Sequence, residues 1–132
     1  MQIQYFGLSS LKLTSKDTTS ILDPFSKESG LTPPRGAADL IILSEKDNEL
    51  YSATSGISGE PFIVDGPGEY DVKDNTITGS PVKDKDGNVI TIYLIELEGV
   101  KILFMAHIKK LSLSQDEIED IGEVDIMLVP VG

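Results

Sequence analysis

The chain has 132 residues, which suits one domain, so residues 1–132 are treated as a single domain. Its formal net charge of −11 argues against nucleic acids and anionic membranes as partners, because both attract basic surfaces. It has no cysteine, which excludes disulfides, thiolate zinc sites and cysteine nucleophiles. With no run of 18 apolar residues and no signal-peptide pattern, we expect a cytoplasmic protein.

Alternation of polar and apolar residues predicts short strands in the first half of the chain. The first strand contains Ile3 and Tyr5. Asp23-Pro24 ends the third strand, because proline cannot donate to a strand ladder. A loop rich in glycine and proline spans residues 26–37, and residues 45–55 are expected to form one or two helical turns. The other predicted strands of this half are 11–14, 18–22 and 39–43.

The second half is predicted to contain more strands and one clear helix. Residues 89–97 and 100–105 form the clearest hairpin, turned by Glu98-Gly99. A helix over 114–121 is indicated by a capping box and by a glycine placed to end it. The last strand, 125–129, is apolar and is expected to be buried on both faces. Shorter strands are predicted at 62–64, 69–72 and 76–78, so the fold class is α/β and strongly β-rich.

The clearest candidate site follows the apolar strand 39–43. Glu45, Asp47 and Glu49 come directly after this strand, and His107 follows the strand 100–105. If both strands end at the same edge of a sheet, these side chains could converge on Mg²⁺, Mn²⁺ or Ca²⁺. The simpler interpretation, which we prefer, is a solvated charged face, with His107 a loop histidine. Ser9-Ser10 is no convincing nucleophile, since no histidine has the context of a base.

Several segments, in the right order, resemble the metallo-β-lactamase-fold hydrolases, and within them the small UlaG-like branch. The most specific is 62–72, which contains the sequence DGPGEY. The opening hairpin at 1–13 is similar too, as are the strand end ILDPF at 21–25, the strand at 38–44 and the segment 116–131. The resemblance implies half of a four-layer α/β/β/α sandwich, with a mixed sheet and one or two helices.

The resemblance fails at the residues that would bind metal. The family carries His-x-His-x-Asp-His after the strand serine, whereas residues 45–50 here read EKDNEL, with Glu49 at the position of the water-orienting Asp. No histidine stands near Lys83-Asp84, and Ala106-His107 takes the place of a Gly-Asp pair that bridges the metals. A dinuclear zinc centre needs at least three ligands per metal. One histidine therefore cannot build such a centre of the family type within one chain, and no cofactor is expected unless a divalent metal binds the carboxylates.

Three functional classes stay open at this point. The preferred one is a non-catalytic binding or structural module with a degenerate metal site. The others are a metal-dependent hydrolase that uses carboxylate ligands, and one half of an enzyme whose partner chain supplies histidines; the chain is thus not assigned as an enzyme. Because a half-sandwich would leave a sheet face without its partner sheet, we expect a homodimer that pairs sheet on sheet. The sequence identifies no small-molecule ligand.

Overall fold

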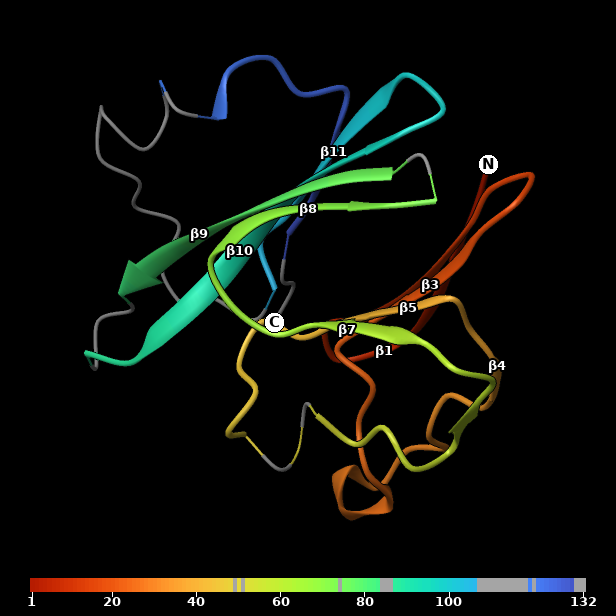
Figure 1. Cartoon of the computed structure of the whole chain (residues 1–132). Coiled ribbons are helices and arrows are strands. Elements are labelled where there is room, and N and C mark those ends of the chain that lie inside the picture. The colour runs from red at the N-terminus through yellow and green to blue at the C-terminus, as the bar shows by residue number, and fades with distance from the viewer. Residues whose placement is uncertain are drawn as a thin grey trace.

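Two five-stranded sheets face each other and form most of the molecule (Figure 1). The structure, a computed structural model, describes residues 1–48, 50, 52–73, 75–83, 87–106, 119 and 121–129. The first sheet has the order β1-β2-β3-β5-β7. Its strands are β1 (Gln2–Gly7), β2 (Ser10–Thr14), β3 (Thr19–Leu22), β5 (Leu40–Ile42) and β7 (Phe62–Val64).

The second sheet has the order β12-β11-β10-β9-β8, and it contains the longest strands of the chain. Its strands are β8 (Gly68–Val72), β9 (Asn75–Lys83), β10 (Val89–Leu97), β11 (Val100–Phe104) and β12 (Ile126–Leu128). A small parallel pair joins β4 (Gly36–Ala37) to β6 (Ile57–Ser58), and a 3₁₀ turn, η1, covers Lys27–Ser29.

Both large sheets are mixed. The strands β3, β5 and β7 pair in parallel, as do β11 and β12, and the other neighbours are antiparallel. The antiparallel pairs follow from tight turns: Glu98 and Gly99 both have positive φ, as a two-residue hairpin turn requires. The parallel pairs instead need crossovers, which here are long loops in the described residues.

The main core lies between the two sheets. Alternate side chains of β2, β3, β5 and β7 point towards β9, β10 and β11, since strand side chains alternate between faces. The largest fully buried members of this cluster include Tyr93, Phe104, Leu13, Leu22 and Leu40. The sheets of this one chain thus cover each other's inner faces. The homodimer is predicted on the premise that one sheet face lacks a partner sheet. That premise is wrong, because the second sheet of the same chain covers this face.

The outer face of the first sheet is covered by irregular chain. Ile21 and Ile41 are paired neighbours on this face, and both are fully buried although they lie outside the inter-sheet cluster. Phe25 is also fully buried, and the loops on this side are tied together by Ala53 N–H donating to Pro24 O at 2.9 Å. In Figure 1 these loops lie on the side of the first sheet away from the second.

The predicted strands are confirmed, but two other expectations change. The described residues of 45–55 form turns and no helix. The strand β12 is not buried on both faces: Ile126 and Leu128 pack against the core, whereas Met127, which points to the other face, is 56% exposed. Most of the predicted helix 114–121 lies outside the described residues. Within the described part of the chain, no helix is long and apolar enough to cross a membrane.

The strand β9 is longer than the predicted 76–78. It contains Pro81. Proline occurs within a strand only where its missing N–H interrupts no hydrogen bond to a neighbouring strand. The last pair between β8 and β9 joins Gly68 to Gly79, so Pro81 lies beyond the end of β8. Its missing N–H therefore costs no hydrogen bond to that neighbour.

Candidate functional site

A buried carboxylate, Asp23, organises the edge of the first sheet where β3 and β5 end. Its Oδ1 accepts a hydrogen bond from the Ser44 backbone N–H at 2.8 Å. Its Oδ2 accepts from the Ser44 hydroxyl at 2.6 Å and from the Ser9 hydroxyl at 2.9 Å. All three side chains are buried, so the carboxylate exchanges water for charge-assisted hydrogen bonds. The Ser9–Asp23–Ser44 cluster joins three segments that are far apart in the sequence.

Local backbone geometry explains how Asp23 reaches this position. Its φ is 45°, in the left-handed region that Asp tolerates better than most residues. Its N–H donates to Ile42 O at 2.9 Å, which continues the parallel pairing of β3 with β5 for one more residue. Pro24 follows and ends the strand. The carboxylate is thereby aimed sideways at Ser44, the residue that ends the β5 segment.

The second sheet is attached to this same edge. The Thr91 N–H donates to Ser44 O at 2.9 Å, and the Tyr93 hydroxyl donates to Leu43 O at 2.7 Å. Both donors belong to β10. Burial raises the pKa of Tyr93 far above its ordinary value, so the hydroxyl stays protonated and remains a donor. The end of β5 is therefore held from both sheets.

The charged residues that follow Ser44 form an exposed turn. Asn48 N–H donates to Glu45 O at 3.1 Å, and the Asn48 side-chain amide donates to the Glu45 carboxylate at 3.2 Å. Lys46 and Asp47 are exposed. Glu45 is thus engaged within its own turn, and Asp47 points to solvent.

Two of the four candidate metal ligands can be placed, and they do not form a site with each other. Glu49 and His107 lie outside the described residues. Among the residues that the structure does describe, no group of three or more His, Cys, Asp or Glu side chains is arranged to hold a metal ion. The Asp23 carboxylate accepts hydrogen bonds from Ser9 and Ser44. The described residues therefore do not form a metal centre of the family type.

The sequence interpretation missed Asp23 and Tyr93 as the residues that hold this edge. Asp23 carries a usable signal, since it stands between an apolar strand and a proline. Tyr93 carries none, because it is one apolar residue in a long apolar strand. Its partner, the Leu43 carbonyl, is 50 positions away in the chain.

Comparison with known proteins supports the same architecture. A family model described as a β-lactamase superfamily domain matches residues 2–132. A solved structure from Thermotoga maritima, a proposed zinc-dependent hydrolase of the metallo-β-lactamase superfamily, is 27% identical with a TM-score of 0.78. The match covers 95% of this chain but only 58% of the Thermotoga protein. No relative was found among the curated proteins.

Two more distant structures share the fold alone. The metallo-β-lactamase fold protein YhfI from Bacillus subtilis is 12% identical with a TM-score of 0.58, over 89% of this chain and 61% of YhfI. The diiron β-hydroxylase CmlA from Streptomyces venezuelae is 15% identical with a TM-score of 0.64, over 95% of this chain and 33% of CmlA.

Proposed function

Because this chain belongs to the metallo-β-lactamase superfamily, we propose that it is a non-catalytic member that works as a self-associating binding module. The observation that carries this proposal is an apolar surface, here named the β1–β12 edge. Ten large hydrophobic side chains of the described chain are exposed, and six belong to this edge: Met1, Ile3, Tyr5, Leu8, Met127 and Val129. The other four, Leu31, Phe62, Ile63 and Val89, are spread over other segments.

The β1–β12 edge combines two features that favour association. Between the strands lies a groove of about 370 Å³, whose lining is mostly apolar and includes Tyr5, Leu8, Phe104 and Met127. Both strands also end their sheets, so each pairs on one side only among the described strands. Open strand edges next to apolar surface invite a further strand. A second copy related by a two-fold axis would extend both sheets and cover the groove.

The small number of possible metal ligands supports the non-catalytic part of the proposal. The sequence has one histidine. Of the described carboxylates at the β5 end, Asp23 is engaged by serine hydroxyls and Glu45 by the Asn48 side chain, while Asp47 is exposed. The alternative is that a partner or a further part of a longer protein supplies metal ligands. That alternative is favoured by one observation, which is that the chain spans 58% of the Thermotoga hydrolase structure.

Light scattering of the purified 132-residue chain tests self-association. We expect a mass of twice 14.3 kDa at micromolar concentration. Met127→Lys and Ile3→Lys place charges on the β1–β12 edge and should shift the mass towards that of a monomer. Val89→Lys is the matched control, since Val89 is 52% exposed but lies at the start of β10. A monomeric wild-type chain, or equal effects of all three substitutions, would contradict the proposal.

A further inference from the structure

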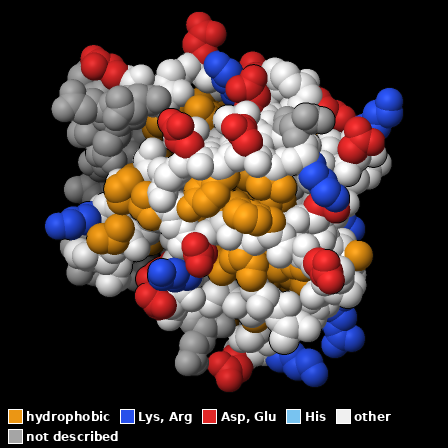
Figure 2. All heavy atoms as spheres, viewed as in Figure 1, with side chains coloured by type: hydrophobic (Ala, Val, Ile, Leu, Met, Phe, Trp, Pro, Cys, Tyr) orange, Lys and Arg blue, Asp and Glu red, His pale blue; other side chains and the backbone are white. Residues whose placement is uncertain are grey.

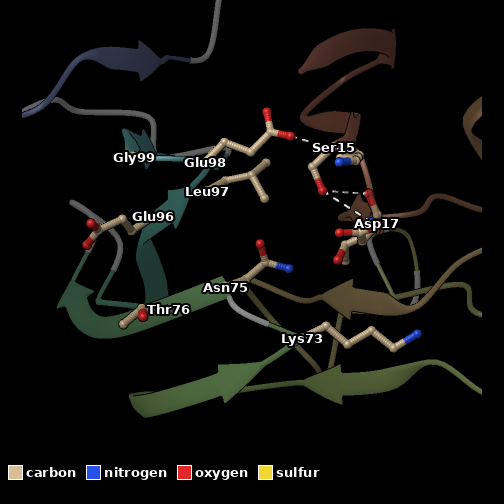
Figure 3. Close-up of a pocket in the computed structure, with 11 residues that line it drawn as sticks. Ser15, Asp17, Lys73, Asn75, Thr76, Glu96, Leu97, Glu98 and Gly99 are labelled. Carbon is tan, nitrogen blue, oxygen red and sulfur yellow. Dashed lines mark hydrogen bonds between the residues drawn. The ribbon is translucent and has the colours of Figure 1, made fainter.

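A second cavity lies at the opposite end of the sandwich from the Ser9–Asp23–Ser44 cluster. It measures about 300 Å³, near the lower bound for small-molecule pockets. Three hairpin turns surround it: the β2–β3 turn at 15–18, the β8–β9 turn with Lys73, and the β10–β11 turn with Glu98-Gly99. Figure 3 shows side chains of all three turns around one space. We name it the hairpin-end cavity.

The feature that points to a ligand is the side chain of Asn75. It is only 3% exposed and lines the cavity, yet its Nδ2 has no hydrogen-bond partner in the described structure. In Figure 3 the amide projects into the space between Leu97 and Asp17. Buried amide groups are almost always paired in folded proteins. An unpaired donor aimed into a cavity is therefore suited to an acceptor oxygen that enters from outside.

The other polar groups restrict the kind of molecule that would bring this oxygen. The Ser15 hydroxyl already donates to Thr18 O at 3.2 Å, and Lys73 Nζ is held by Asp39. Asp17 is exposed at the rim and faces the same space as Asn75 (Figure 3). The cavity thus offers one unpaired neutral donor on its inner wall, together with the carboxylates of Asp17, Glu96 and Glu98.

The rim already holds an ammonium group. The α-ammonium of Met1 lies 3.4 Å from Glu98 Oε2, and Glu98 Oε1 accepts a hydrogen bond from Lys16 N–H at 3.0 Å. These contacts hold the pKa of Glu98 below its ordinary value, the Lys16 amide being the largest cause. Glu98 is therefore ionised at neutral pH, and it shows that a carboxylate on this rim accepts an ammonium group.

We propose that the hairpin-end cavity binds a small zwitterion of the size of a free α-amino acid. Its carboxylate accepts the hydrogen bond of the Asn75 amide, and its ammonium group lies against Asp17. This inference does not depend on the self-association proposed above, because none of the residues that line the cavity belongs to the β1–β12 edge.

Two-dimensional NMR of ¹⁵N-labelled protein tests the site with three probes: glycine, acetate and methylammonium. We expect glycine to shift the Asn75 side-chain amide signals saturably, and acetate and methylammonium, which each carry one of the two charges, to bind at least about tenfold more weakly. Absence of a saturable shift at about 10 mM glycine would overturn the proposal. So would acetate that binds as tightly as glycine.

Two variants assign the contacts. Asn75→Asp removes the inner donor and adds a charge of the same sign as the ligand carboxylate. Asp17→Asn removes the negative charge of Asp17 at an exposed position where folding is not at risk. Each should weaken glycine binding about tenfold or more. Asn88→Asp is the control, since Asn88 is exposed in the β9–β10 connection, away from the cavity. Unchanged glycine affinity in Asp17→Asn would contradict the proposed orientation even if Asn75→Asp failed to fold.

Discussion

Asp23 accepts two hydrogen bonds from Ser44, one from its backbone N–H at 2.8 Å and one from its hydroxyl at 2.6 Å. The two residues lie 21 positions apart, at the ends of neighbouring parallel strands. This contact fixes where the β5 segment stops and the exposed turn 45–48 begins. This edge of the first sheet is thus held by a carboxylate and two serines.

Replacement of the carboxylate should be costly for stability. Asp23→Ala leaves the Ser44 N–H and two serine hydroxyls without their acceptor, and it puts Ala at a positive φ. We expect a loss of about 3 kcal/mol in the free energy of unfolding, measured by denaturant titration. Asp23→Asn should lose less, because an amide oxygen still accepts and Asn tolerates this φ.

Asp47→Ala is the matched control for these variants, because Asp47 is exposed in the turn that follows Ser44. It should change the free energy of unfolding by less than about 0.5 kcal/mol. Equal losses in Asp23→Ala and Asp47→Ala would show that the buried cluster does not hold this edge.

The close approach between β9 and β10 gives a second prediction. A Cβ at Gly79 would stand 2.8 Å from Tyr93 Cε1 and 2.9 Å from Gly66 O, and the latter is backbone that cannot turn aside. We expect Gly79→Ala to lower the free energy of unfolding by about 1–3 kcal/mol, as overpacking does. The same substitution at Gly66, where nothing lies within 4 Å of the new Cβ, should have a small effect in the same denaturation assay.

The ion pair of Asp39 predicts a pH dependence. Lys73 Nζ lies 2.6 Å from Asp39 Oδ1, and this bond, followed by the Thr19 N–H, lowers the pKa of Asp39 below its ordinary 3.8. A carboxyl whose pKa is lower in the folded than in the unfolded state stabilises the fold at pH values above its unfolded-state pKa. That stabilisation is lost as the pH falls through the folded-state pKa. Wild type should exceed Asp39→Asn in stability by at most about 1 kcal/mol at neutral pH, since the pair is partly exposed.

Denaturant titrations from neutral to acid pH check this sign. The difference between wild type and Asp39→Asn should close as pH falls below about 4. Glu60→Gln, at an exposed position, serves as the control and should stay parallel to wild type. A difference that widens on acidification would refute the role given to Lys73.

Elemental analysis tests the absence of a resident metal. After equilibration with Zn²⁺ and Mn²⁺ and removal of free ions, we expect less than about 0.1 metal ion per chain, since the sequence has one histidine and no cysteine. Stoichiometric metal would overturn the non-catalytic assignment. In that case Asp47→Ala and His107→Ala should abolish binding if carboxylates and the one histidine form the site.

Much of the strand pattern can be predicted from the sequence, because period-two alternation is local. Val89–Leu97 and Val100–Phe104 are examples, with Glu98-Gly99 as an unmistakable turn. The pairing of strands into two sheets is different, since it depends on contacts such as Tyr93 with Leu43 that no local pattern encodes. The same limit explains the error about the open sheet face.

The candidate site, like the strand arrangement, could be predicted only in part. The location at the end of β5 could be predicted, because an apolar strand that runs into charge marks a sheet edge. Which groups hold that edge could not, since Ser9, Asp23 and Ser44 come from three segments and meet only in the fold. Asn75 is a further case: that its buried Nδ2 has no partner among the described residues is visible only in three dimensions.

The parallel run of β3, β5 and β7 has a consequence for how the chain folds. The hairpins β1–β2–β3 and β8–β9–β10–β11 close through short turns and can form early, on the microsecond scale of isolated hairpins. The pairs β3–β5 and β5–β7 must wait until the loops between them have been closed, which costs chain entropy before any pairing is gained. We therefore expect the docking of β5 between β3 and β7 to be the slow step. The hydrogen bonds that Asp23, Thr91 and Tyr93 make with the end of β5 would then be among the last to form.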